Sequence, residues 1–276
     1  MAIQLGTVAA IGFPDFASPK WLTCLRRLGC TVVQAYRSQE AGVTVQEMID
    51  YIAAGQMPCD SLHAIYGEQY DPSALDESAR RYAIDAYRRE GELALQLGGT
   101  LVVIHCATIR EEGIDEAEHR GRIAQLKKSI IDLGHFGEQI GVTFAFENLP
   151  GYHAIGYDVA ELSALLGEAG APRTGMCFDT GHAHMVADVA DCIRAAGDQL
   201  VYVHLSDNSG QADEHKMPSY GTMDIDAMAR ALCEVNYQGT LMLEVFCPVE
   251  ELEAMIDNGC ADRLADMLAV ANGTGP

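Results

Sequence analysis

The sequence predicts an α/β fold, a single (β/α)8 TIM barrel that takes in residues 1–276 as one domain. The length of 276 residues is close to the roughly 250 that such barrels usually have. Short apolar runs rich in β-forming residues alternate with longer runs of helical periodicity, the pattern of parallel strands joined by crossover helices. Eight such apolar runs can be counted, which is the number that closes this barrel.

The predicted strands and helices follow one another along the whole chain. The strands are expected at residues 4–10, 31–36, 58–63, 100–106, 142–147, 175–179, 200–204 and 240–245. The helices are expected at residues 19–28, 45–54, 77–97, 116–140, 158–168, 185–196, 224–235 and 249–271. Thr44 with Glu47 has the spacing of a capping box. Glycines mark five turns from helix to strand, at Gly29, Gly55, Gly98, Gly141 and Gly239.

The composition limits the partners and the compartment. The formal charge is 18 − 40 = −22, with a pI near 4.6, so the surface repels phosphate backbones and nucleic acid is disfavoured as a partner. The nine cysteines form no Cys-x-x-Cys pair, and several lie in apolar runs, which indicates buried free thiols in a reducing compartment. No signal peptide or membrane-spanning run is visible, and we expect a cytoplasmic protein.

Residues that bind metals recur at the ends of the predicted strands. They are His63, His105, Glu147, Asp179, His204 and Glu244. The carboxyl ends of barrel strands converge on one mouth, so these side chains should share a site. Burying several carboxylates together without a cation is costly, and imidazole and carboxylate suit divalent ions. The polar stretch 206–222 follows a strand, where a functional loop is expected.

Two local motifs narrow the fold to a family. They are Phe178-Asp179-Thr180-Gly181-His182, and His204-Leu205-Ser206-Asp207-Asn208 followed by Asp213-Glu214-His215. With these motifs, the sequence from about residue 63 to residue 244 resembles the xylose isomerase-like barrel superfamily. That superfamily holds sugar and sugar-phosphate isomerases and epimerases, as well as endonuclease IV-type enzymes.

The resemblance implies a ligand set and catalytic roles. One divalent ion would be held by Glu147, Asp179, His204 and Glu244, and the two glutamates would also act as acid and base. His182, three residues after the ligand aspartate, would contact the substrate. A cation on a carbonyl and its neighbouring hydroxyl stabilises an enediolate, so a flanking carboxylate can move the proton. We therefore expect a sugar, sugar-phosphate or keto-polyol isomerase or epimerase that uses Mn, Zn, Co or Mg.

The endonuclease IV-like branch offers a different comparison, with three zinc ions. The additional candidate ligands that correspond to this branch are His63, His105, His182, Asp213 and His215, and Tyr66 also matches it. The segments 67–71 and 213–215, which would contact DNA, are acidic. Relatives usually have a Gly-x-Gly turn after the last histidine, whereas this chain reads Met217-Pro218-Ser219-Tyr220-Gly221-Thr222. One glycine is replaced, and we expect a loop of different shape.

Several functions therefore stay open. The tagatose-epimerase branch has an arginine six residues after its ligand histidine, and Gly210 at that place argues against a simple ketohexose epimerase. A dehydratase or lyase acting on a keto sugar would need the same base and cation, a zinc phosphodiesterase would need three ions, and a barrel that only binds a sugar or metal would need no turnover. No dinucleotide or P-loop motif is visible. A homo-oligomer is expected from the resemblance, and His153 and His184 are left as ordinary loop or helix residues.

Overall fold

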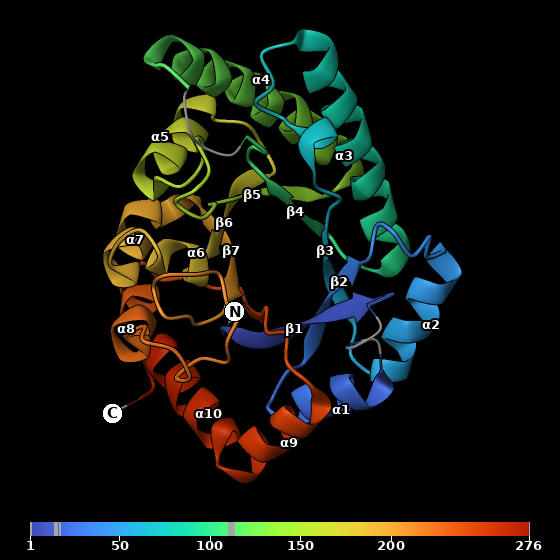
Figure 1. The fold of residues 1–276 in the computed structure, drawn as a ribbon, viewed down its shortest axis with the longest axis vertical. Helices are drawn as coiled ribbons and strands as arrows, with labels where there is room; N and C mark the ends of the chain where they lie inside the picture. The colour runs from blue at the N-terminus through green and yellow to red at the C-terminus, as the bar shows by residue number, and fades with distance from the viewer. Residues whose placement is uncertain (1, 14–15, 17, 110–113, 276) are drawn as a thin grey trace.

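A computed structural model describes residues 2–13, 16, 18–109 and 114–275. Eight parallel strands form a closed barrel in sequence order, with β8 paired to β1 (Figure 1). The strands are β1 Gln4–Ile11, β2 Val32–Arg37, β3 Cys59–His63, β4 Leu101–His105, β5 Thr143–Glu147, β6 Thr174–Asp179, β7 Leu200–Leu205 and β8 Thr240–Leu243. The predicted (β/α)8 barrel is therefore confirmed.

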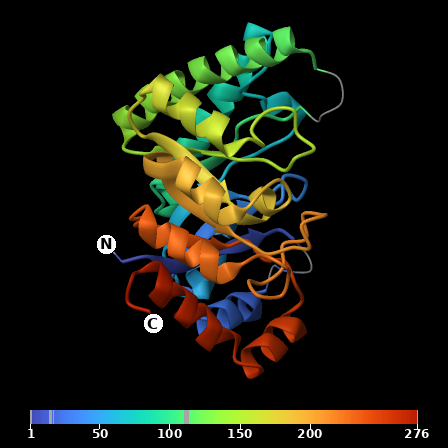
Figure 2. The same cartoon turned by 90° about the vertical axis from the view of Figure 1, so that its left-hand side faces the viewer.

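Helices surround the strands, as Figure 1 shows. They are α1 Pro19–Arg27, α2 Val45–Gly55, α3 Glu77–Leu97, α4 Glu116–Ile140, α5 Val159–Ala169, α6 Thr180–His184, α7 Val189–Ala196, α8 Ile225–Glu234, α9 Val249–Asp257 and α10 Cys260–Ala271. Two short 3-10 turns, η1 Glu68–Tyr70 and η2 Gly197–Gln199, complete the order. In Figure 2 both termini lie on one side of the barrel, and the orange loop between β7 and α8 projects from the other.

The predicted helix at 185–196 is wrong at its start. The chain forms α6 directly after β6, and α7 begins only at Val189, after Asp188 caps its first turn by accepting a hydrogen bond from the Asp191 N–H at 2.9 Å. The predicted helix at 249–271 is divided as well. Gly259, with φ +77°, stands between α9 and α10 in a left-handed conformation that an α-helix cannot continue through.

Local signals at other helix ends agree with the structure except at Gly55. The capping box of Thr44 and Glu47 is formed at the start of α2. Gly98 and Gly141 end α3 and α4 with positive φ. Gly55 is instead the last residue of α2, where a Cβ would lie 2.6 Å from a Leu22 methyl, so its role there is close packing. Gly239 lies between α8 and β8 as predicted, although its φ is not positive.

The packing between barrel and helices is apolar. All nine cysteines are free and seven are buried, which confirms the prediction of buried free thiols. Trp21 of α1 is fully buried, and its indole N–H donates to the Cys247 carbonyl at 3.1 Å. Within the described parts of the chain, no helix is long and apolar enough to cross a membrane.

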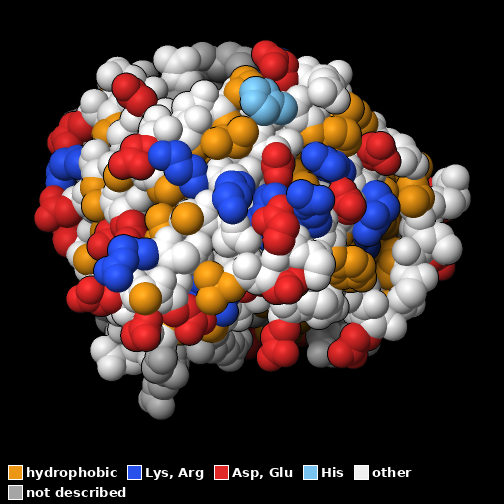
Figure 3. Space-filling view, turned by 90° about the horizontal axis from the view of Figure 1, so that it is seen from above, with side chains coloured by type: hydrophobic (Ala, Val, Ile, Leu, Met, Phe, Trp, Pro, Cys, Tyr) orange, Lys and Arg blue, Asp and Glu red, His pale blue; other side chains and the backbone are white. Residues whose placement is uncertain are grey.

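Charged runs on α3 and α4 face solvent. Figure 3 views the molecule from above, where Lys and Arg side chains lie among Asp and Glu. Arg88 pairs with Asp85 at 3.0 Å, and Lys127 pairs with Glu168 at 3.0 Å. These cations are matched by neighbouring carboxylates, as expected for solvated helix faces.

Candidate active site and metal centre

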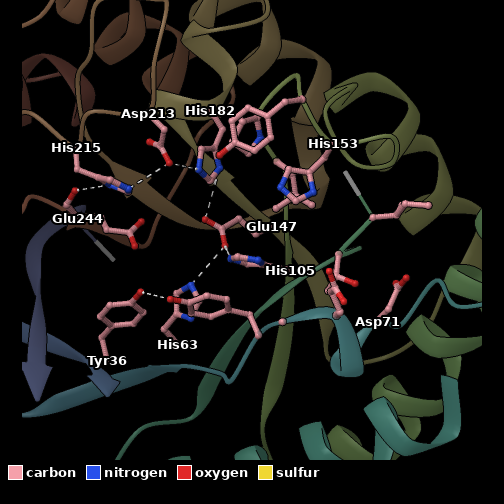
Figure 4. A pocket seen from close by; sticks show the side chains of 18 of the residues that line it. Tyr36, His63, Asp71, His105, Glu147, His153, His182, Asp213, His215 and Glu244 are labelled. Atoms are coloured by element: carbon pink, nitrogen blue, oxygen red, sulfur yellow. Dashed lines mark hydrogen bonds and ion pairs between the residues drawn. The ribbon is translucent and has the colours of Figure 1, made fainter. Parts of the chain in front are cut away.

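A cavity of about 860 Å³ opens at the carboxyl ends of the strands. Its lining includes His63, His105, Glu147, His182 and Glu244. Asp213 and His215, from the loop between β7 and α8, also line it. These seven predicted residues therefore meet at one mouth, and Figure 4 shows their side chains around the cavity. Asp179 and His204 are fully buried and are not among its lining residues.

The barrel register sets the strand-end side chains level with one another. His105 at the end of β4 lies opposite Glu147 at the end of β5. Asp179 at the end of β6 lies opposite His204 in β7. Glu244 directly follows β8, and its N–H donates to the Leu205 carbonyl at 3.1 Å. Each of these side chains is thus placed by the hydrogen-bonded barrel rather than by a loop.

The central group consists of Glu147, Asp179, His204 and Glu244, all buried. The Nδ1 atom of His204 lies 2.9 Å from Glu147 Oε1 and 3.0 Å from Glu244 Oε2. Asp179 Oδ2 lies 3.9 Å from the same nitrogen. One donor atom from each of the four residues falls within 4.8 Å of the others. Three carboxylates and one imidazole thus converge on a single point.

A second group uses the other oxygen of Glu147. Its Oε2 atom lies 3.7 Å from His63 Nε2 and 3.5 Å from His105 Nε2. The three residues form another set with donor atoms within 4.8 Å of one another. Glu147 therefore stands between the two groups and offers one oxygen to each.

A third group consists of His182, Asp213 and His215. Asp213 Oδ2 lies 3.4 Å from His182 Nε2 and 3.3 Å from His215 Nε2, so one carboxylate oxygen joins both rings. His182 is also near the central group, with its Nδ1 atom 3.7 Å from Asp179 Oδ1. The third group adjoins the other two.

Backbone carbonyls fix the orientation of three of these histidines. The Nδ1 of His63 donates to the Ala64 carbonyl at 2.9 Å, that of His182 to the Asn148 carbonyl at 2.8 Å, and that of His215 to the Glu244 carbonyl at 3.1 Å. A carbonyl can only accept, so in each ring Nδ1 carries a proton. Nε2 is left to face the cavity. Metal-ligating histidines are usually held in this way.

Burial and nearby charges shift the pKa values of the carboxylates and histidines of the site. Burial raises the pKa of Asp179, and the charges of Glu244 and Glu147 raise it further, to about 7, although His182 opposes them. Burial also acts to raise the pKa of Glu147, but the charge and hydrogen bond of His204 outweigh it and lower this pKa to about 2. Burial lowers the pKa of His105 to about 3. Protons compete here with any cation that binds.

The donor set fits a divalent cation. Glu147 Oε2 and Asp179 Oδ2 are buried, yet neither forms a hydrogen bond with the residues that the structure describes. Buried carboxylate oxygens without a donor are costly, and a cation would satisfy both. Mixed oxygen and imidazole ligands suit Mn, Zn, Co or Mg.

Aromatic side chains and one arginine complete the cavity wall. The Tyr36 and Tyr66 hydroxyls lie 3.0 Å apart, and the Tyr66 ring stacks on His105 with 5.0 Å between ring centroids. Arg122 of α4 also lines the cavity, with its guanidinium paired to Asp71 at 3.0 Å. Sequence reasoning singled out only Tyr66 of these, because strand-end tyrosines and helix arginines are common.

Of three further residues, His184 behaves as the sequence predicted, His153 does not, and Asn148 was missed. His153 lines the cavity, whereas His184 is absent from its lining and contacts the Thr222 hydroxyl at 2.9 Å. Asn148 was missed. Its side chain accepts from the Asp179 N–H at 2.7 Å and donates to the Asp179 carbonyl at 3.0 Å. Its place directly after Glu147, a predicted ligand, was the available signal.

Comparisons with known proteins agree with this geometry. The family described as "Xylose isomerase-like TIM barrel" matches residues 22–264. An uncharacterized protein of Methanocaldococcus jannaschii is 24% identical over 188 residues, which cover 66% of this chain and 63% of that protein. Fructoselysine 3-epimerase of Escherichia coli O157:H7 is 22% identical over 193 residues, covering 67% of this chain and 64% of the enzyme. Each match spans less than two thirds of the relative's own length.

A solved structure is similar over the whole chain. The crystal structure of D-psicose 3-epimerase in the presence of D-fructose aligns with a TM-score of 0.74 and 16% sequence identity. The alignment covers 98% of this chain and 100% of that one. At this identity the likeness concerns the fold.

Proposed function

Because the chain belongs to the xylose isomerase-like TIM barrel family, we propose that it is a divalent-metal-dependent isomerase or epimerase of a sugar, sugar phosphate or keto-polyol. One observation carries this proposal: Glu147 and Glu244 approach a single nitrogen of His204, at 2.9 and 3.0 Å, from different strands. Two carboxylates at one buried point can hold a cation and also exchange a proton with a substrate. Proteins named fructoselysine 3-epimerase and D-psicose 3-epimerase, to which the chain is similar, support the class.

The ion would be held by Glu147, Asp179, His204 and Glu244. When bound, it would polarise a carbonyl and the neighbouring hydroxyl oxygen, and so acidify the C–H between them. The four ligands are buried, so the substrate end that reaches them leaves bulk water. Water exclusion strengthens each electrostatic contact with the substrate.

The proton would be moved by the two glutamates and guided by His182. One glutamate removes the proton from the carbon beside the carbonyl, and the other returns a proton to the substrate. His182 is held by the Asn148 carbonyl through Nδ1, so its Nε2 faces the cavity, where it can contact a substrate oxygen. Asp179 is assigned to the ion alone, since its Oδ1 already accepts from the His182 N–H at 2.7 Å.

Solvent exchange tests this function across a whole class of substrates at once. The protein, loaded with Mn, Co, Zn or Mg, is incubated in deuterium oxide with a panel of ketoses, sugar phosphates and keto-polyols. Proton NMR then measures loss of carbon-bound hydrogen and appearance of an epimer or isomer. We expect exchange with the parent protein, and a loss of at least about 100-fold in Glu147→Gln and Glu244→Gln, the scale of general acid–base catalysis.

The matched control is Glu138→Gln, on the exposed surface of α4, which should exchange like the parent. Gln variants that exchange as fast as the parent would contradict the roles of the glutamates. Release of water from the substrate would instead identify a dehydratase or lyase. Saturable sugar binding without exchange under any metal would identify a barrel that binds without turnover.

A second candidate, phosphodiester hydrolysis, is favoured by the two extra groups that flank the central one. His63 and His105 lie against Glu147, and His182 and His215 share Asp213 at 3.4 and 3.3 Å. Three ions side by side would suit a phosphoryl substrate. Elemental mass spectrometry of the parent and of His105→Ala and His215→Ala tests this arrangement. Two or three ions per chain, with one lost in each variant, would make phosphodiesters and abasic DNA the next substrates to assay.

The cavity wall opposes a DNA substrate. Arg122 is its one Lys or Arg among the described lining residues, and its guanidinium already pairs with Asp71 at 3.0 Å and with Glu118 at 2.9 Å. Glu68 adds a further negative charge to the wall. A small carbohydrate therefore remains the preferred substrate.

A further inference from the structure

The loop between β7 and α8, residues 206–224, is organised around one buried carboxylate. Asp207 is fully buried, and its two oxygens accept four backbone N–H groups of the same loop. The donors are Asn208 at 2.8 Å, Ser219 at 3.1 Å, Gly221 at 2.9 Å and Met223 at 3.1 Å. Asp207 also exchanges two backbone hydrogen bonds of 2.8 Å with Lys216. Both ends of the loop are therefore tied to a single side chain.

This loop holds two residues in a conformation that favours glycine. His215 has φ +46° and Ser219 has φ +73°. Side chains other than glycine adopt this left-handed region at an energetic cost, and such residues persist only where their surroundings impose it. Ser219 stands two residues before Gly221, in the spacing of a Gly-x-Gly turn. Its N–H bond to Asp207 holds the turn although the glycine is replaced.

Gly221 shows how closely the loop packs on this carboxylate. A Cβ at position 221 would lie 2.2 Å from Asp207 Oδ1 and 2.3 Å from the Asn208 carbonyl oxygen. Asn208 in turn donates from its side chain to the Gly181 carbonyl at 2.8 Å, directly before His182. The loop is thus hydrogen-bonded to α6, the helix that carries His182, and Asp213 of the loop contacts the same histidine.

We propose that Asp207 is a positioning residue, whose carboxylate imposes the strained loop shape that brings Asp213 and His215 to the cavity. Asp207 is not among the described residues that line the cavity, so it acts through the loop. An ionised carboxylate can accept four N–H groups, whereas an amide offers one oxygen and two donors. The inference rests on the proposed function in that it concerns how Asp213 and His215 reach the same cavity, and its zinc measurement rests on the three-ion arrangement of the second candidate.

Asp207→Asn tests the inference in two measurements. Hydrogen–deuterium exchange on the metal-free protein should show amides 208–223 exchanging about 10- to 100-fold faster, the scale of hydrogen bonds lost from a charged acceptor. Strands β1 to β8 should keep their protection. In a zinc titration followed by native mass spectrometry, the affinity for the ion at His182, Asp213 and His215 should fall about 10- to 100-fold. The affinity for the central ion should stay unchanged.

The matched control is Asp224→Asn, the same substitution at the end of the same loop. Asp224 is exposed and caps α8 through a hydrogen bond from the Ala227 N–H at 2.9 Å. This variant should leave both loop exchange and zinc binding like the parent. If both substitutions increased hydrogen–deuterium exchange in the loop to the same extent, the specific role of Asp207 would be overturned.

Two further variants test the contact between Asp207 and the loop, one by disrupting it and one by relieving the strain that it holds. Gly221→Ala should reproduce the Asp207→Asn result, because its Cβ would displace the carboxylate. Ser219→Gly, added to Asp207→Asn, should restore part of the loop protection and zinc affinity, because glycine adopts positive φ without cost. Failure of this rescue would overturn the claim that the carboxylate holds strain at position 219.

The outcomes separate this inference from the proposed function. Unchanged loop exchange in Asp207→Asn, or loss of protection throughout the barrel, would overturn the positioning role. A parent protein that binds only the central ion would overturn the three-group metal arrangement. The metal-free exchange experiment would still decide whether Asp207 shapes the loop.

Discussion

Asp179→Asn should stabilise the metal-free protein while weakening its stabilisation by metal. Asp179 is fully buried, with its Oδ1 bonded to the His182 N–H at 2.7 Å and its Oδ2 without a hydrogen bond to any described residue. The amide oxygen of an asparagine can keep the first contact, and its amino group can replace the unbonded oxygen. The substitution therefore removes a charge with little change in shape.

The magnitude follows from the raised pKa of this carboxyl. Burial and the nearby charges of Glu244 and Glu147 raise the pKa of Asp179 from 3.8 to about 7. At about 1.4 kcal/mol per pKa unit, ionised Asp179 costs the folded metal-free protein about 4 kcal/mol at pH 8. Because the folded-state pKa lies above the unfolded one, this cost appears as pH rises between the two values and is absent below both. The advantage of the variant should thus fall by about half at pH 5.5.

Urea unfolding with and without chelator measures these effects. We expect Asp179→Asn to be about 2–4 kcal/mol more stable than the parent in chelator at pH 8, and less so at lower pH. With metal at 100 times its Kd, the parent should gain about 2.7 kcal/mol, and the variant should gain less because it lacks one of the four proposed ligands. A variant that is destabilised in chelator at pH 8, or whose advantage does not change with pH, would refute the electrostatic reasoning.

Two other predictions concern the scaffold that supports the site. Arg37→Met should lower the free energy of unfolding, measured by urea denaturation, by about 3–5 kcal/mol. Arg37 now pairs with the buried Glu90 through two contacts of 2.7 and 2.9 Å, and the variant leaves that carboxylate without this partner. A change below about 1 kcal/mol would contradict this prediction. Gly175→Ala should cost about 1–3 kcal/mol, since its Cβ would lie 2.4 Å from a Val201 methyl. Gly167→Ala in α5, whose nearest neighbour would be 3.8 Å away, should instead leave stability equal or higher by up to about 1 kcal/mol, and differential scanning calorimetry of both variants checks the contrast.

The sequence predicted the strands well because their signal is local. Each strand is a short apolar run, and the observed bounds differ from the predicted ones by one or two residues. The helix errors have a different cause. The continuous periodicity across 249–271 gave no warning that Gly259 would adopt positive φ, and α6 was missed because its five residues carry no amphipathic repeat.

Two of the residues that the sequence missed, Asn148 and Asp207, contact the backbone of a distant segment. Asn148 bonds the main chain of Asp179, and Asp207 bonds amides up to sixteen residues ahead, at Met223. Such contacts depend on where the chain returns after a loop. Residue type and spacing do not reveal that path, and the place of Asn148 directly after Glu147 was the one local signal.

The sequence by itself determined the barrel and the mouth where the candidate residues gather, because strand periodicity is local and all parallel strands of a barrel end on the same side. Only the tertiary structure decided how the candidate residues divide into three groups, with Glu147 between two of them and Asp213 joining His182 to His215. It also decided which ring nitrogen of His63, His182 and His215 faces the cavity, because that choice depends on a carbonyl brought near by the fold. The position of a residue in the sequence decides at which strand end it lies. Its contact partners depend on interatomic distances, and those are set by the packing of the whole barrel.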